Sequence, residues 1–189
     1  MEYAAKSLQK GTMRSTSRIF AILAVASAFA VPSALEAQSA RQGFWFNGGL
    51  GFGSLGCQDC TERANGFSGN LALGGTISSK VLLGVGTNGW TREEDGVRLT
   101  AGTLTAQIRF YPWNAGNFYV MGGLGVASMD LQMGGITATE HAAGAVLGMG
   151  YDFRIGRNLS ITPYWNGVGM SNDNGDANFG QIGLGITIH

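Results

Sequence analysis

The sequence is poor in cysteine, histidine and proline. Its 189 residues include two cysteines, two histidines and three prolines. Cys57 and Cys60 have no histidine or further cysteine nearby, so a four-ligand zinc site is excluded. A thioredoxin-like redox site would need a βαβ setting, which the flanking pattern lacks. We therefore expect no metal and no cofactor, and we predict a local disulfide between Cys57 and Cys60 in an exported chain.

The sequence also lacks an apolar run long enough to cross a membrane as a helix. Its longest such run, Ile19–Val31, has 13 residues, whereas a spanning helix needs about 20. Basic residues precede this run, and Pro32 and small residues follow it. This order is typical of an export signal. We predict a signal peptide over residues 1–37, cleaved after Ala37, and one domain over residues 38–189.

Charge of either sign is scarce after the expected cleavage site. That segment carries eight basic and ten acidic side chains. No basic patch or basic run stands out among them. The charge balance therefore gives no indication of a nucleic-acid partner.

What the chain does have is a strict alternation of apolar and mixed residues, clearest in the stretch 103–127. Leu104, Ala106 and Ile108 alternate with polar residues, and the alternation resumes at Phe118 after a turn around Pro112. A period of two places alternate residues on opposite faces of a strand. Each arm has about ten residues, the length of a tilted strand that crosses a bilayer.

The same alternation recurs along the chain and predicts eight strands. They span about 43–53, 68–77, 80–90, 103–111, 118–127, 142–153, 159–166 and 179–188. No charged residue falls on the apolar face of any of them. A soluble sandwich would expose one face to water, so eight clean apolar faces favour an all-β fold, a closed eight-stranded antiparallel transmembrane barrel.

The other face combines glycines with large aromatics, which we expect to fill the interior. The predicted inward aromatics are Trp45, Trp90, Tyr111, Tyr119 and Tyr164. Eight strands leave an interior just wide enough for side chains, so a conducting pore is not expected. Pro163 has no N–H to donate, and we predict a bulge or a broken ladder bond there.

The predicted connections alternate between short and long. Short ones are expected near 78–79, 112–117 and 154–158, and long ones near 54–67, 91–98, 128–141 and 167–178. Most acidic residues fall in the long set and most basic residues at the other end. Short periplasmic turns and longer outer loops are typical of outer-membrane barrels.

The C-terminal stretch QIGLGITI carries a more specific resemblance. Gln181, Gly183, Ile186 and Ile188 fall on the positions of the assembly signal of the small eight-stranded outer-membrane barrels, although His189 follows instead of an aromatic residue. The chain resembles this family, which includes the OmpA transmembrane domain and the OmpX/Ail proteins. The resemblance implies location in the bacterial outer membrane. It also implies contact with outer-membrane lipid and lipopolysaccharide, and assembly by the barrel-assembly machinery and periplasmic chaperones.

Three functions are compatible with this sequence. The first is a non-catalytic outer-membrane protein that acts in envelope integrity or surface interaction through its outer loops. The second is an enzyme that modifies lipid acyl chains, with His141 as the base and Ser128, Asp130 and Ser171 as candidate partners. The third is a secreted barrel that binds a small ligand. We take the first, without a catalytic residue, as the leading interpretation.

The last expectation concerns charge in the interior near the short turns. Arg109 and Asp152 are both predicted to face inward from strands that are not neighbours. A buried charge without a partner is costly, and a hydrogen-bonded pair offsets that cost. We therefore predict an ion pair between Arg109 and Asp152 across the lumen.

Overall fold

The structure is a computed structural model that describes residues 41–57, 62–113, 116–173 and 175–189. The predicted signal peptide and its cleavage site lie outside these residues. Among the described residues, the strands are β1 (Phe44–Cys57), β2 (Ala64–Ser78), β3 (Val81–Glu94), β4 (Val97–Phe110), β5 (Phe118–Met133), β6 (Ile136–Tyr151), β7 (Phe153–Arg154), β8 (Leu159–Asn172) and β9 (Gly175–Ile188). No helix in this part of the chain is long and apolar enough to span a membrane.

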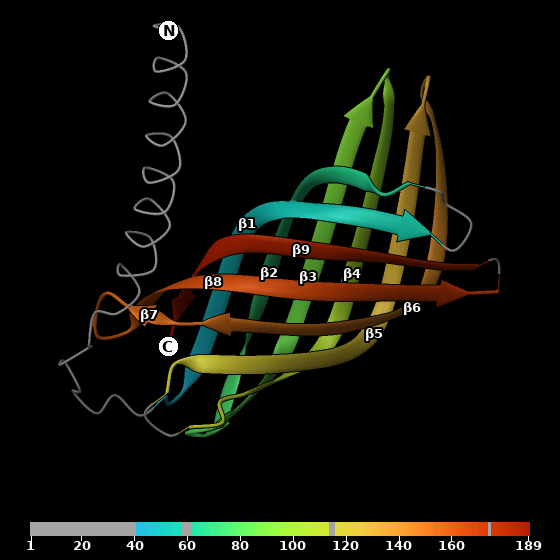
Figure 1. The fold of residues 1–189 in the computed structure, drawn as a ribbon. Coiled ribbons are helices and arrows are strands. Elements are labelled where there is room, and N and C mark those ends of the chain that lie inside the picture. Colours follow the sequence, from blue (N-terminus) through green and yellow to red (C-terminus); the bar gives the residue numbers. More distant parts are fainter. Residues whose placement is uncertain (1–40, 58–61, 114–115, 174) are drawn as a thin grey trace, which may run out of the picture. The chain divides into compact units, whose positions relative to one another are not determined.

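The strands form one closed antiparallel barrel (Figure 1). Each strand from β1 to β5 pairs with the next along the chain, and β1 also pairs with β9. The barrel closes where β8 pairs with β6 on one side and β9 on the other. The two-residue strand β7 continues β6 along β8. The predicted eight-stranded fold is therefore confirmed.

The gap between β6 and β7 lies opposite Pro163, as predicted. Pairing between β6 and β8 ends at Gly150 and Tyr164, and it resumes where Phe153 pairs with Ile161. The register is the same on both sides, so the ladder is interrupted without a bulge. Pro163 has no N–H for the bond that would fill this gap.

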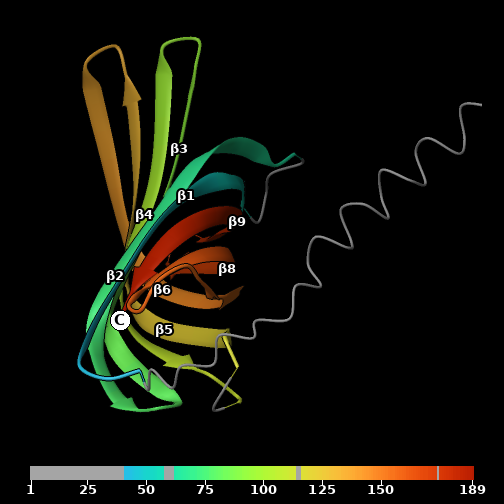
Figure 2. The ribbon, with the colours of Figure 1, turned by 90° about the vertical axis from the view of Figure 1, so that its left-hand side faces the viewer.

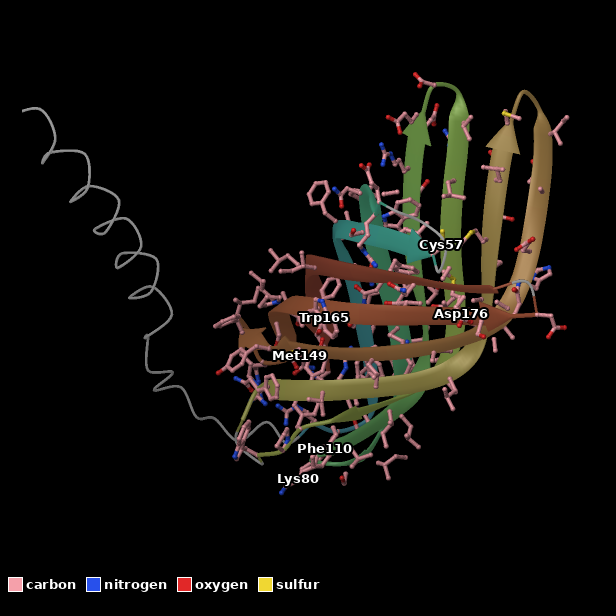
Figure 3. The ribbon with its side chains drawn as sticks, turned by 45° about the vertical axis from the view of Figure 1, so that its right-hand side comes forward. Cys57, Lys80, Phe110, Met149, Trp165 and Asp176 are labelled. Carbon is pink, nitrogen blue, oxygen red and sulfur yellow. The ribbon has the colours of Figure 1, made fainter. Side chains whose placement is uncertain are left out.

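The barrel is apolar outside and filled inside. Outward side chains such as Leu124 and Leu147 are 74% and 68% exposed, as expected for a lipid-facing wall. Figure 3 shows Phe110, Met149 and Trp165 on this outer wall. The predicted inward aromatics, Trp45, Trp90, Tyr111, Tyr119 and Tyr164, are all buried. That prediction is confirmed.

The tight connections at one end agree with the sequence, but the long loops predicted at the other end are wrong. β3 and β4 meet at Asp95-Gly96, and β5 and β6 meet at Gly134-Gly135, with positive φ at all four residues. Such pairs form two-residue hairpin turns whose twist matches the flanking strands. Residues expected in loops near 91–98 and 128–141 are therefore strand residues, and so are most of those near 54–67 and 167–178.

Candidate functional site

Charge divides the barrel into two chemically different ends. The described acidic residues lie at the end where the long hairpins turn, with the exception of Asp152. They are Glu62, Glu93, Glu94, Asp95, Asp130, Glu140, Asp173 and Asp176. The opposite end carries Arg41, Lys80, Arg154 and Arg157. Figure 3 shows Lys80 at one end and Asp176 at the other.

At the acidic end, four strands continue beyond the closed wall as a protruding sheet, which we define as residues 92–99 and 130–142. Pairing of β3 with β2 stops at Thr91, and pairing of β6 with β8 begins only at Ala143. β4 and β5 remain paired up to Val97 and Met133, which joins the two hairpins into one sheet. Figure 2 shows these two hairpins extending beyond the other strands.

The two faces of the protruding sheet reverse the polarity of the barrel wall. The face that continues the lumen side carries a group of apolar residues, Val97, Leu99, Leu131, Met133, Ile136 and Ala138, together with Arg92 and Glu94 on β3 and Glu140 near the base of β6. The face that continues the lipid side is polar and carries Arg98, Asp130, Gln132, Thr137, Thr139 and His141. Leu131, Met133 and Ile136 are 43%, 58% and 75% exposed. Exposed apolar groups gathered on one face are characteristic of an interaction surface.

Among the described residues, no strand lies beside the β6 edge of the protruding sheet. Residues Ile136–Ala142 pair with β5 alone, and all of them except Ala142 are exposed. The Asn172 side chain donates to the carbonyl of His141 at 3.4 Å, near the base of this edge. An unpaired edge presents N–H and C=O groups to any strand that approaches, so it can accept another strand.

The residues considered for catalysis share one face but are not joined. Ser128 and His141 are cross-strand partners, and Ser171 pairs with Ala143 in the next row. Asp130 accepts a hydrogen bond from Thr139 at 2.5 Å. Within the described residues, the His141 side chain makes no hydrogen bond to Ser128, Asp130 or Ser171. A nucleophile and its base need such a contact, so the geometry lacks this support for the acyl-modifying hypothesis.

Only one half of the predicted Cys57–Cys60 disulfide lies within the described residues. Cys57 ends β1 at the acidic end (Figure 3), and Cys60 lies outside the described residues. The disulfide therefore stays a prediction. Among the described residues, no three His, Cys, Asp or Glu side chains are grouped so that they could hold a metal ion.

In the lumen, the expected ion pair between Arg109 and Asp152 stays a prediction, because these two side chains contact other groups within the described part of the chain. Both side chains are buried. Of the described residues, Asp152 instead accepts hydrogen bonds from the hydroxyls of Tyr111 and Thr162, each at 2.7 Å. The Arg109 guanidinium lies over the ring of Tyr119, 4.1 Å from its centre. Each charge therefore has hydroxyl or ring partners inside the barrel.

Arg41 completes this network and was not predicted from the sequence. Its guanidinium lies 3.6 Å above the centre of the Tyr111 ring and donates to the carbonyl oxygen of Gly116 at 2.6 Å. Burial lowers the pKa of Arg41 from its ordinary value. Burial raises the pKa of Tyr111, which lies just beyond β4, so its hydroxyl stays protonated and donates to Asp152. The only sequence signal was a basic residue just before the first strand.

The middle of the lumen is closed by amide side chains. Asn88 Oδ1 accepts hydrogen bonds from Gln181 at 2.8 Å and from Asn166 at 2.9 Å, which links β3, β8 and β9. Gln181 belongs to the predicted assembly signal. Gly183 also faces inward in that signal, whereas Ile186 and Ile188 are exposed on the lipid side. Recognition of this signal by the assembly machinery stays a prediction.

Comparison with known proteins agrees with this architecture. The sequence model of the family described as outer membrane protein beta-barrel domain matches residues 21–189. The fold is similar to that of Neisserial surface protein A, with a TM-score of 0.60, 14% identity, and coverage of 77% of this chain and 96% of that chain. It is also similar to Ail, the attachment invasion locus protein of Yersinia pestis, with a TM-score of 0.56, 15% identity, and coverage of 78% and 99%. No curated protein matches the chain in sequence.

Proposed function

The chain belongs to the family of outer membrane protein beta-barrel domains, and from this premise we propose that it is a non-catalytic surface protein. It is a closed eight-stranded antiparallel barrel of the bacterial outer membrane. Its proposed task is to bind an extended segment of an external protein along the protruding sheet. The barrel wall contacts outer-membrane lipid, and the polar face at the lipid boundary would contact lipopolysaccharide. Assembly would proceed through periplasmic chaperones and the barrel-assembly machinery.

The observation that carries this proposal is an apolar face beside an unpaired strand edge, both outside the closed wall. An added strand along Ile136–Ala142 would gain main-chain hydrogen bonds from the edge. Its alternate side chains would lie beside Ile136 and Ala138 on the same face, next to Leu131 and Met133 of β5. Burying one leucine side chain contributes about 1.5–3 kcal/mol, so a few such contacts suffice for specific binding.

We expect Leu131→Asp to abolish binding while leaving the barrel intact. Leu131 is exposed and lies beyond the closed wall, so a carboxylate there disturbs no core packing. Cells that produce the protein and cells that lack it are applied to surfaces, each coated with one purified protein. A surface is used further when it retains more of the producing cells than of the cells that lack the protein. On those surfaces, attachment of Leu131→Asp cells should fall about tenfold or more, because an apolar contact is replaced by a charge.

The matched control is Gln132→Asp, the next residue on the opposite face of the same hairpin. It adds the same charge at another exposed position and should leave attachment unchanged. Surface levels of both variants are compared by the mobility difference between heated and unheated barrels. Equal loss in both variants, or no surface that distinguishes producing cells from cells without the protein, would contradict the proposal.

A further inference from the structure

The end of the barrel opposite the protruding sheet contains a basic pocket. It has a volume of about 200 Å³ and is lined by Arg41, Arg154, Arg157 and His189, together with Asn158 and Ser160. These residues come from the segment before β1, from β7 and the turn that follows it, from the start of β8, and from the residue after β9. By the orientation of the family, with short turns on the inner side, this pocket faces the periplasm.

Acidic side chains are scarce around the pocket in the described part of the chain. Asp152 is the one described acidic residue at this end, and Tyr111 and Thr162 already donate to it. His189 Nε2 lies 3.5 Å from Asp152 Oδ2, which is too long for a well-formed hydrogen bond. Among the described residues, no carboxylate lies within ion-pair distance of Arg41 or Arg157. The pocket therefore has capacity for an anion.

Within the described part of the chain, two of its side chains have buried nitrogen atoms without a hydrogen-bond partner. Arg41 is only 4% exposed, and its Nε has none. The rest of its guanidinium is held in place by the carbonyl oxygens of Ser79 and Gly116 and by the Tyr111 ring. His189 Nδ1 also has no partner. A buried donor without a hydrogen bond destabilises the fold, and an anion oxygen in the pocket would accept that hydrogen bond. Because the guanidinium is already fixed in position, binding would cost little conformational entropy.

We propose that this pocket binds a phosphate group. Three guanidinium groups line it, and a phosphate offers three or more strong acceptor oxygens, whereas a carboxylate offers two. The phosphate comes either from a soluble ligand in the periplasm or from the headgroup of an anionic phospholipid in the inner leaflet. Ile155, Leu159 and Ile188 are exposed on the lipid side near the pocket, where acyl chains of such a lipid would lie.

The test is a titration of the purified protein in a neutral maltoside detergent, which carries no phosphate. Inorganic phosphate is the probe in one arm, and a short-chain phosphatidic acid is the probe in the other. Binding is followed by NMR signals of the Arg41 Nε–H group and the His189 ring. We expect saturable shifts of these signals. Arg157→Gln should weaken binding about tenfold, because one charge-assisted contact is lost.

Lys80→Gln is the matched control, since Lys80 is a basic residue at the same end that does not line the pocket. It removes the same charge and should leave the dissociation constant unchanged. Saturation by inorganic phosphate supports a soluble source, and saturation by phosphatidic acid alone supports a lipid headgroup. The proposal is overturned if neither probe saturates these signals, or if Lys80→Gln weakens binding as much as Arg157→Gln. Because Arg157 is exposed in a turn, its replacement leaves the packed lumen unchanged.

Discussion

Asp152→Ala should lower the free energy of unfolding of the barrel by about 3–5 kcal/mol, the usual cost of breaking a buried charged network. Asp152 is 1% exposed and accepts hydrogen bonds from Tyr111 and Thr162. Alanine leaves both hydroxyls without their acceptor. It also removes the negative charge of Asp152 from the end of the lumen where Arg109 is buried. Urea unfolding of the protein in phospholipid vesicles measures the change.

Two further variants separate the network from a general effect of lost charge. Asp152→Asn keeps an acceptor for one hydroxyl, so its loss of stability should be smaller than that of Asp152→Ala. Asp173→Ala removes a carboxylate at the exposed acidic end and should change stability by less than about 0.5 kcal/mol. If Asp152→Ala unfolds at the same urea concentration as Asp173→Ala, the lumen network does not hold the barrel together.

Gly74→Ala should also destabilise the barrel, through backbone contact instead of charge. Gly74 in β2 faces the lumen, and a Cβ there would overlap the carbonyl oxygen of Leu83 and come within 2.5 Å of Gly84 Cα. The Leu83 oxygen also accepts the indole N–H of Trp45 at 3.3 Å, so any shift of β3 disturbs a buried aromatic. Overpacking of this kind costs about 1–3 kcal/mol, and contact with backbone places this site at the upper end.

The adjacent Gly75 provides the control, because it lies on the outer face and an added Cβ there would have no atom within 4 Å. Gly75→Ala should leave both the yield of folded barrel and its unfolding midpoint unchanged. The measurement is the fraction of each variant that migrates as a folded barrel without heating. Equal folded fractions for the two alanine variants would show that close approach of β2 and β3 does not limit assembly.

The sequence predicted the membrane-spanning part of the fold well because burial there is decided residue by residue. Each outward position faces lipid and each inward position faces a narrow lumen, so the alternation of apolar and mixed residues indicates which side chains face which environment. Leu104 and Ile108, for example, are exposed, and Thr103, Thr105 and Gln107 are buried, as their order predicts. The interruption opposite Pro163 was predictable for a similar reason, since it follows from one missing donor.

The protruding sheet was missed because its alternation reverses. In β4 and β5 beyond Thr100, the apolar residues face the lumen side and the polar residues face outward, since water replaces lipid around the sheet. If outward residues are assumed to be apolar, as they are in the barrel wall, Val97–Leu99 does not fit a strand and is interpreted as a charged loop. Asp95-Gly96 and Gly134-Gly135 were the available signals, because these dipeptides favour two-residue hairpins.

The lumen contacts could not be predicted from spacing along the chain. Arg109 and Asp152 belong to strands that are not neighbours, and their separation depends on the tilt and closure of the whole barrel. The same closure brings Arg41 and His189, from opposite ends of the described chain, to one pocket. Sequence placed these residues at the correct end and face but could not decide which partner each would meet.

Amide hydrogen exchange along β6, measured in phospholipid nanodiscs, tests most directly that four strands leave the membrane as a sheet with an unpaired edge. In Ala143–Gly150 every amide should exchange slowly, because both sides of the strand are paired. In Ile136–Ala142 slow and fast amides should alternate, because only every second N–H points toward β5. Uniform protection from Ile136 to Gly150 would show that the edge is covered. Uniformly fast exchange over Ile136–Ala142 would show that the protruding sheet does not form.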